Sequence, residues 1–304
     1  MFLRQIKSFS LPVFLLFALL ACASSQEKAR MQLGQMNVKY DESSFVERAR
    51  AGDIFSVKLF LQAGINPNVI NKNGETALVV AARFGRHEVV EALLAYGADL
   101  NTRDKQFGAT PLIWASVNGY PNLIKLLLEK GADIEAKGEK NGMTALMSAA
   151  VGGKTEVIKL LLEKGAEVNA TDNNNRTAVM WAAHCGQAEA VKLLLDEGAN
   201  LAVKEKSQGL NALMAAAANG KAEAVKVLLD GGADVNAIDD QAKTALMWAA
   251  QNGRSDVLPL LLEKGANVNA RDKDDRTALD LAREYKQNDA EEILLKAGAS
   301  ENKG

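Results

Sequence analysis

Histidine and cysteine have the greatest capacity for nucleophilic or metal chemistry in this sequence, and its 304 residues contain only two of each. His184 and Cys185 are adjacent, which brings a potential thiol nucleophile and a potential imidazole base together in the sequence. Adjacency alone does not make a catalytic dyad, and no further histidine or cysteine stands at the spacing of a metal site. We therefore expect a protein that is not an enzyme and uses no cofactor, with Cys185 as a partly buried thiol. The alternative is an exported enzyme or redox accessory protein that uses His184 and Cys185.

The first cysteine, Cys22, follows a segment with the features of an export signal. Arg4 and Lys7 precede an apolar stretch from Leu11 to Ala21, which is shorter than the roughly 20 residues of a membrane-spanning helix. The boundary Leu19-Leu20-Ala21-Cys22 resembles the lipobox of bacterial lipoproteins. This resemblance implies that residues 1–21 are a signal peptide and that Cys22 is acylated.

The same resemblance implies a membrane contact through a lipid anchor, and we expect an outer-membrane lipoprotein of the bacterial envelope that faces the periplasm. The alternative is cleavage after Ala23, which would release a soluble periplasmic or secreted protein. Residues 22–42 are then the lipidated N-terminus and a polar tether without sustained apolar periodicity. Alternatively, part of this segment, Met36 to Tyr40, packs on the first helix and is not a tether.

The composition is that of an ordinary soluble protein. Apolar residues make up 48% of the chain, charged residues 24%, and the formal net charge is −2. These values exclude disordered, collagen-like and polytopic membrane classes, and the near-neutral charge gives no long-range attraction to nucleic acid. Because aromatic residues make up only 5%, the core must consist mainly of Ala, Val and Leu in closely packed helices.

Two signatures recur along most of the chain. A glycine followed by alanine or isoleucine recurs every 33 or 34 residues, at Gly64, Gly97, Gly131, Gly165, Gly198, Gly232, Gly265 and Gly298. A Thr-Ala-Leu block or a close variant lies between successive glycines and begins at Thr76, Thr110, Thr144, Thr177, Asn211, Thr244 and Thr277. A period this regular indicates a solenoid.

Each period predicts two antiparallel helices. In one repeat, Thr144 is a suitable N-cap for a short helix, which presents Leu146 and Ala149 on one face and ends near Gly152. A second, leucine-rich helix follows and ends at Gly165. Polar segments rich in Asn, Asp and Gly connect one pair to the next and predict hairpin-like turns.

These blocks resemble the ankyrin repeat, whose Thr-Pro-Leu-His-x-Ala pattern is matched at Thr110 to Ala115 except that Ile113 replaces the histidine. The resemblance implies an all-α fold, an ankyrin-repeat solenoid of antiparallel helix pairs linked by hairpin-like turns. About eight repeats with terminal caps would occupy residues 43–301, followed by a tail at 302–304. It also implies a capping or packing role for His87, and a concave groove beside projecting turns.

Several positions depart from the repeat pattern. Asn175, Ala242 and Asp275 replace the glycine before the Thr block, and Asn and Asp tolerate a positive φ whereas Ala does not readily. We therefore predict a differently shaped turn at Ala242. Pro259 lies deeper in a second helix than Pro121 does, and should distort the start of that helix.

The remaining functional signal is a surface. Trp114, Trp181 and Trp248 occupy the same slot in alternate repeats, so they pack against the neighbouring repeat, anchor a protein partner, or do both. Other candidates are apolar or charged residues at turns and helix ends: Phe84, Phe107, Tyr120, Met143, Arg176, His184, Leu210 and Tyr285.

We interpret the protein as a monomeric, membrane-tethered scaffold. Its groove and turns would bind a protein partner in the envelope, and a preformed surface of this kind needs no cofactor. Delivery to a host cell as an interaction effector is a further alternative, and it would require a chain without the membrane anchor.

Overall fold

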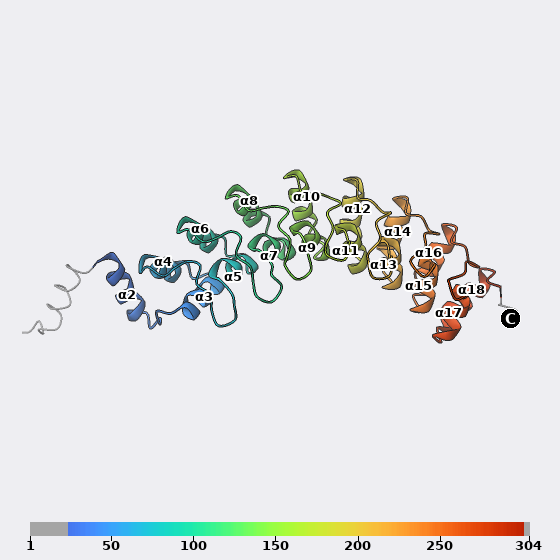
Figure 1. Cartoon of the computed structure of the whole chain (residues 1–304), viewed down its shortest axis with the longest axis horizontal. Helices are drawn as coiled ribbons and strands as arrows, with labels where there is room; N and C mark the ends of the chain where they lie inside the picture. Colours follow the sequence, from blue (N-terminus) through green and yellow to red (C-terminus); the bar gives the residue numbers. More distant parts are fainter. Residues whose placement is uncertain (1–23, 301–304) are drawn as a thin grey trace, which may run out of the picture. The chain divides into compact units, whose positions relative to one another are not determined.

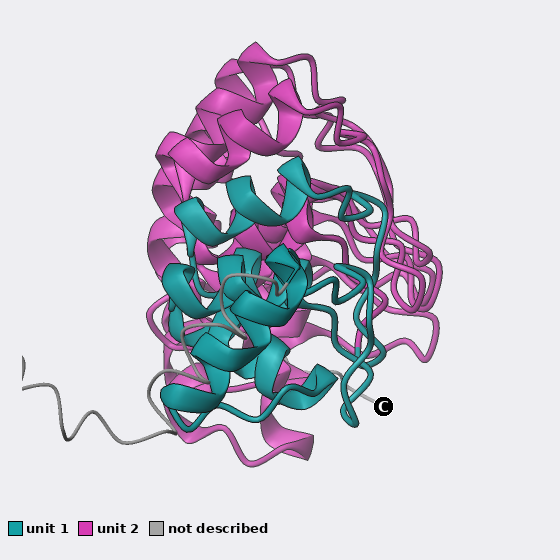
Figure 2. Cartoon of the chain, turned by 90° about the vertical axis from the view of Figure 1, so that its left-hand side faces the viewer, with its two compact units in different colours: residues 1–106 teal, residues 107–304 magenta. Residues whose placement is uncertain are grey.

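The computed structural model describes residues 24–300, which form 17 helices divided between two compact units, residues 1–106 and residues 107–304 (Figures 1 and 2). Cys22 and the predicted signal peptide lie outside the described residues. The first unit contains α2 Ser25–Gln35, α3 Glu42–Ala51, α4 Ile54–Gln62, α5 Ala77–Arg83 and α6 His87–Ala95. The second unit contains α7 Pro111–Asn118, α8 Pro121–Glu129, α9 Ala145–Val151, α10 Thr155–Glu163, α11 Ala178–Cys185, α12 Ala188–Asp196, α13 Ala212–Ala218, α14 Ala222–Asp230, α15 Ala245–Gln251, α16 Leu258–Glu263, α17 Ala278–Glu284 and α18 Asn288–Lys296.

The second unit stacks helix pairs as the repeat predicts. The short first helices α7, α9, α11, α13, α15 and α17 pack on one another in chain order, and the second helices α8, α10, α12, α14, α16 and α18 form a row beside them (Figure 1). Buried alanines such as Ala149 and Ala182 line the first helices. Small side chains permit this close packing, so the predicted all-helical solenoid is confirmed.

Side-chain hydrogen bonds cap the N-termini of most first helices in this unit. The hydroxyl of Thr144 accepts the N–H of Met147 at 3.3 Å, and the side chain of Asn211, which replaces threonine, accepts that of Met214 at 2.9 Å. Thr177 is different, because its buried Oγ1 has no hydrogen-bond partner within the described part of the chain. The segment before α11 is therefore held by other contacts.

Long side chains connect consecutive repeats. Gln187 donates from Nε2 to the carbonyl of Val151 at 3.2 Å, and Arg254 donates from Nε to the carbonyl of Ala218 at 3.1 Å. These carbonyls are at the ends of the preceding first helices, where the helix itself offers no donor. The later repeat thus completes the hydrogen bonding of the repeat before it.

The first unit corrects the predicted tether, because residues 25–35 form α2. Ser24 and Glu27 make a reciprocal capping box, and Ala29 and Leu33 are buried where α2 packs on α4. Tyr40 then stacks on Phe60 of α4 with 5.5 Å between ring centroids. The segment is polar because most of α2 faces solvent, and two buried residues are too few to give an apolar period.

The turn at Ala242 also differs from the prediction. Ala242 has φ +58°, close to the +76° of Gly74 and the +62° of Asn175 in turns of the same length. All three residues donate their N–H to the carbonyl three residues earlier, so the turn keeps its shape. The next turn supports this conformation, because the N–H of Lys273 donates to the carbonyl of Gln241 at 2.9 Å. The positive φ expected for Asn175 and Asp275 is confirmed.

The predicted distortion at Pro259 is confirmed. Helix α16 begins only at Leu258 and has 6 residues, whereas α14 has 9. The N–H of Leu258 still reaches the carbonyl of Arg254, but at 3.4 Å. The proline ring and its missing N–H explain this late start.

The strained alanine gives a stability prediction. We expect Ala242→Gly to raise the free energy of unfolding by about 0.5–1 kcal/mol, because glycine removes the left-handed strain and this gain exceeds its added chain entropy. Thermal unfolding followed by circular dichroism measures the change. Ala217→Gly, inside α13, is the control and should lose about 1 kcal/mol or more. A lower melting temperature for Ala242→Gly would contradict the assigned turn.

Candidate functional site

The candidate site is the exposed side of the first helices of the second unit together with the turns that precede them. We call it the first-helix face, and it contains Arg176, Trp181, His184, Leu210, Lys243, Trp248, Gln251, Arg276 and Glu284. The same positions of successive repeats meet on this face, because the first helices stack in order.

A buried aspartate holds each of three turns on this face. The Oδ1 atom of Asp172 accepts the N–H groups of Asn174 and Arg176 at 2.8 and 2.9 Å. Asp239 and Asp272 make the same pair of bonds to their own turns. All three residues are at most 6% exposed, so the geometry of the turns is set by carboxylates shielded from water.

The second carboxylate oxygen positions the tryptophans. Trp181 donates from Nε1 to Oδ2 of Asp172 at 3.2 Å, and Trp248 donates to Oδ2 of Asp239 at 2.9 Å. Both indole rings are half-buried, so they pack within the repeats and still present part of the ring. The two interpretations of the tryptophan row, packing and anchor, are therefore compatible.

A cation lies over each of these indole rings. Cζ of Arg176 is 3.9 Å from the ring centroid of Trp181, and Nζ of Lys243 is 4.9 Å from that of Trp248. Arg176 also donates from Nε to Asp172 at 3.1 Å. The stack and this hydrogen bond together fix the position of the charge.

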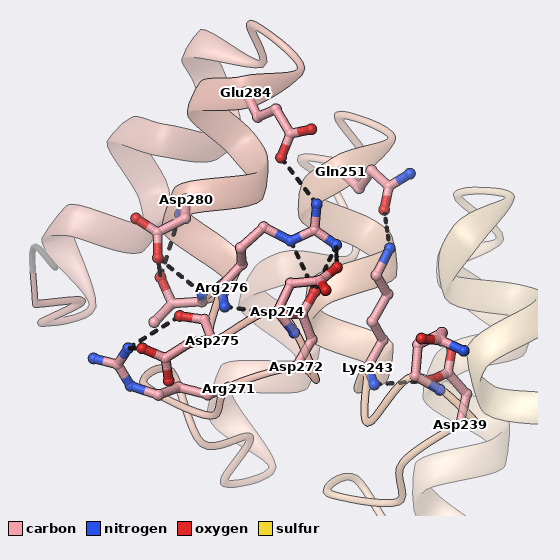
Figure 3. Close-up of polar contacts among 12 residues, drawn as sticks. Asp239, Lys243, Gln251, Arg271, Asp272, Asp274, Asp275, Arg276, Asp280 and Glu284 are labelled. Carbon is pink, nitrogen blue, oxygen red and sulfur yellow. Dashed lines mark hydrogen bonds and ion pairs between the residues drawn. The ribbon is translucent and has the colours of Figure 1, made fainter. Parts of the chain in front are cut away.

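In the last two repeats, the cation has a partner eight residues further along the chain. Lys243 donates to Oε1 of Gln251 at 2.9 Å, and Nη1 of Arg276 is 3.3 Å from Oε2 of Glu284 (Figure 3). Burial acts to raise the pKa of Asp272, but hydrogen bonds from Arg276 outweigh it and hold this pKa below its usual value. This pattern is visible in the sequence as an acid, a cation and a polar residue at fixed distances from the Thr block, for example Asp272, Arg276 and Glu284 around Thr277. The sequence analysis did not predict it as a site.

The structure brings four of the predicted residues together. Arg176, Trp181, His184 and Leu210 line a small open pocket of about 170 Å³, and Met180 and Ala215 are among the other lining residues. Gln208 and Glu205, on the turn before α13, also line it.

The other predicted residues are dispersed. In the second unit, the exposed ring of Phe107 lies edge-on to Trp114, with 5.8 Å between centroids. Met143, Trp114 and Tyr120 are half-buried, and Tyr285 is exposed at the end of α17. In the first unit, the guanidinium of Arg50 lies 5.5 Å from the centroid of the exposed ring of Phe84.

The adjacent pair His184 and Cys185 is poorly suited to thiolate chemistry. Burial raises the pKa of the Cys185 thiol, and the nearby Lys221 only partly offsets this. Partial burial lowers the pKa of His184, and the charges of Arg176 and Lys221 lower it further. A thiol that stays protonated is a weak nucleophile, and residues that are adjacent in a helix do not face each other.

Residues 24–300 also lack two features that would indicate other kinds of site. No helix among them combines the length and the apolar character that a bilayer crossing requires. Within the same residues, no group of three or more His, Cys, Asp or Glu side chains is placed to hold a metal ion.

Comparison with known families identifies the class of protein. A family model described as ankyrin repeats matches three times, at residues 46–138, 135–205 and 213–303. Together these matches cover most of the chain, so the protein belongs to the ankyrin-repeat family. Ankyrin repeats generally serve as protein-interaction scaffolds and are typically not catalytic.

Individual relatives are similar over shorter segments. The chain is 33% identical over 69 residues to the putative ankyrin repeat protein YahD of Escherichia coli, which is 23% of this chain and 34% of YahD. It is 33% identical over 93 residues to a putative ankyrin repeat-containing protein of Treponema pallidum, 28% of this chain and 31% of the relative. It is also 33% identical over 84 residues to protein phosphatase 1 regulatory subunit 27 of Mus musculus, 27% of this chain and 54% of the relative. The chain thus spans only about a third to a half of these relatives.

Proposed function

We propose that the protein is a scaffold that binds a protein partner through the first-helix face of its second unit. The observation that carries this proposal is the pair of half-buried tryptophans, each fixed by a buried aspartate and covered by a cation. Tryptophan and arginine are among the residues most enriched in binding hot spots, and side chains already held in place lose little entropy when a partner binds. The similarity to a protein named as a phosphatase regulatory subunit supports a protein as the ligand.

We further propose that the protein acts in the bacterial envelope, anchored by lipid on Cys22. The signal segment and the lipobox-like boundary support this location, and two of the three relatives compared above are bacterial. Because α2 begins at Ser25, an acylated Cys22 would hold the first unit close to the bilayer surface. The partner would then meet the scaffold near the membrane.

Site-specific photocrosslinking in intact cells tests the binding face. A photoreactive residue at Gln208, which is exposed beside the pocket, should crosslink to one discrete protein. The matched control is Lys192, exposed on the second helix α12, where we expect no such product. A crosslink of equal yield from Lys192, or none from Gln208, would contradict the assigned face.

Lipidation has a separate test. The wild-type protein should partition into detergent and have the mass of a chain that begins at an acylated Cys22, because two or more acyl chains hold a protein stably in a bilayer. Cys22→Ala should move to the aqueous phase. An unacylated wild-type chain cleaved after Ala23 would instead indicate soluble export.

A further inference from the structure

We propose that Arg176 and His184 form a binding site for a carboxylate side chain, Asp or Glu, of the protein partner. This inference rests on the proposed function and adds the chemistry of the contact. It comes from a comparison of two repeats of the same chain, in which equivalent arginines have different neighbours.

The positive charge of Arg276 is neutralised by carboxylates of its own repeat. Its guanidinium pairs with Asp272 at 3.0 Å, with Asp274 at 2.8 Å and with Glu284 at 3.3 Å (Figure 3). Three carboxylates of the same repeat therefore surround one positive charge. A partner's carboxylate would meet repulsion there.

Arg176 has the same frame with two of those carboxylates replaced. Asp172 holds it as Asp272 holds Arg276, but Asn174 stands in place of Asp274 and His184 in place of Glu284. Within the described residues, Asp172 is the only carboxylate that pairs with Arg176. The side chains of the two arginines are nearly equally exposed, 31% and 30%, so burial does not explain the difference.

The surroundings of this site favour an anion. His184 lies near Lys221 as well as Arg176, and both charges lower its pKa. Its Nδ1 is 3.2 Å from Nδ2 of Asn219, on the turn after α13. Nδ2 of Asn219 also donates to the carbonyl of Ala215 at 2.8 Å, so Asn219 holds the imidazole in place, while Lys221 adds positive charge near it.

Glu205 is the acidic residue that lines the same pocket, and its oxygens are already engaged. They accept the N–H groups of Ser207 and Gln208 at 2.8 and 2.7 Å, and also the hydroxyl of Ser207. Burial acts to raise the pKa of Glu205, but these hydrogen bonds outweigh it and lower the pKa, so the group stays ionised within its own turn. Within the described residues it therefore does not pair with Arg176.

The apolar side chains of the pocket indicate which residue should flank the carboxylate in the partner. Met180, Leu210 and Ala215 line it beside Trp181. A segment that places an apolar residue next to its Asp or Glu would cover these side chains while its carboxylate reaches Arg176. Charge complementarity thus selects an acidic segment with a flanking apolar residue.

Binding should depend on pH through His184. A carboxylate favours the imidazolium, so affinity should increase as the pH falls through the pKa of His184. The groups facing this imidazole are Arg176, Lys221 and Asn219, and the nearby acids are Asp172 and Glu205. A partner glutamate stays largely ionised above about pH 4.3, so the increase in affinity is to be measured above that pH.

The test uses the full-length protein and the acetylated tripeptide amide Leu-Glu-Leu, with Leu-Gln-Leu as its uncharged control. Nuclear magnetic resonance should show shifts of the Trp181 indole and the His184 imidazole with the Glu peptide, and binding about tenfold weaker with the Gln peptide. Equal binding of the two peptides, or shifts elsewhere only, would overturn the carboxylate site.

Two variants with the same introduced charge sharpen the test. His184→Glu supplies the carboxylate that Glu284 supplies to Arg276 and should abolish the preference for the Glu peptide. Lys192→Glu, exposed on the second helix α12 and outside the first-helix face, should leave the preference unchanged. His184→Gln should keep binding through Arg176 but lose its increase at low pH. If His184→Glu, folded with an unchanged melting temperature, keeps the preference, the inference fails.

The two proposals fail in different ways. A crosslink from Gln208 without peptide discrimination would remove the carboxylate site and keep the scaffold. Peptide discrimination without any crosslink would keep the carboxylate site and remove the proposed partner-binding role.

Discussion

No helix pair is complete alone, because each needs its neighbours to bury its apolar face and to complete its hydrogen bonds. The rest of the structure depends on this requirement. Carbonyls at the ends of first helices accept hydrogen bonds from side chains of the following repeat, as that of Val151 does from Gln187. The alanine-lined first helices pack closely because their buried side chains are small. Stability is therefore shared between neighbours, and a turn is shaped partly by the turn after it.

This sharing explains why the first-helix face can present charged and aromatic groups in fixed positions. Buried Asp172 and Asp239 each bind the backbone of a turn and the indole of a tryptophan. The same carboxylate therefore supports both the fold and the exposed surface. Repeats differ in the residues around this frame, such as His184, Gln251 and Glu284, and it is there that recognition would be encoded.

Much of the fold follows from the sequence, because Thr marks the start of most first helices and a glycine lies at or just after the end of most helices. Helix α2 was missed because it packs on α4, which is distant in sequence, and a polar segment gives no hint of such a partner. The prediction for the turn at Ala242 was wrong because the bond between Lys273 and Gln241 overrides the intrinsic preference of alanine. At the site, the types and spacing of Arg176 and Trp181 were visible, but the role of Asp172 required knowing which groups its two oxygens face.

Hydrogen exchange of the unliganded protein tests most directly whether the first-helix face is preformed. The amides of Arg176 and Lys243 bond to buried carboxylates, so their protection should approach that of amides inside α11 and α15. If these turn amides exchange as fast as an unfolded chain while the helices stay protected, the face is not held in place before a partner binds.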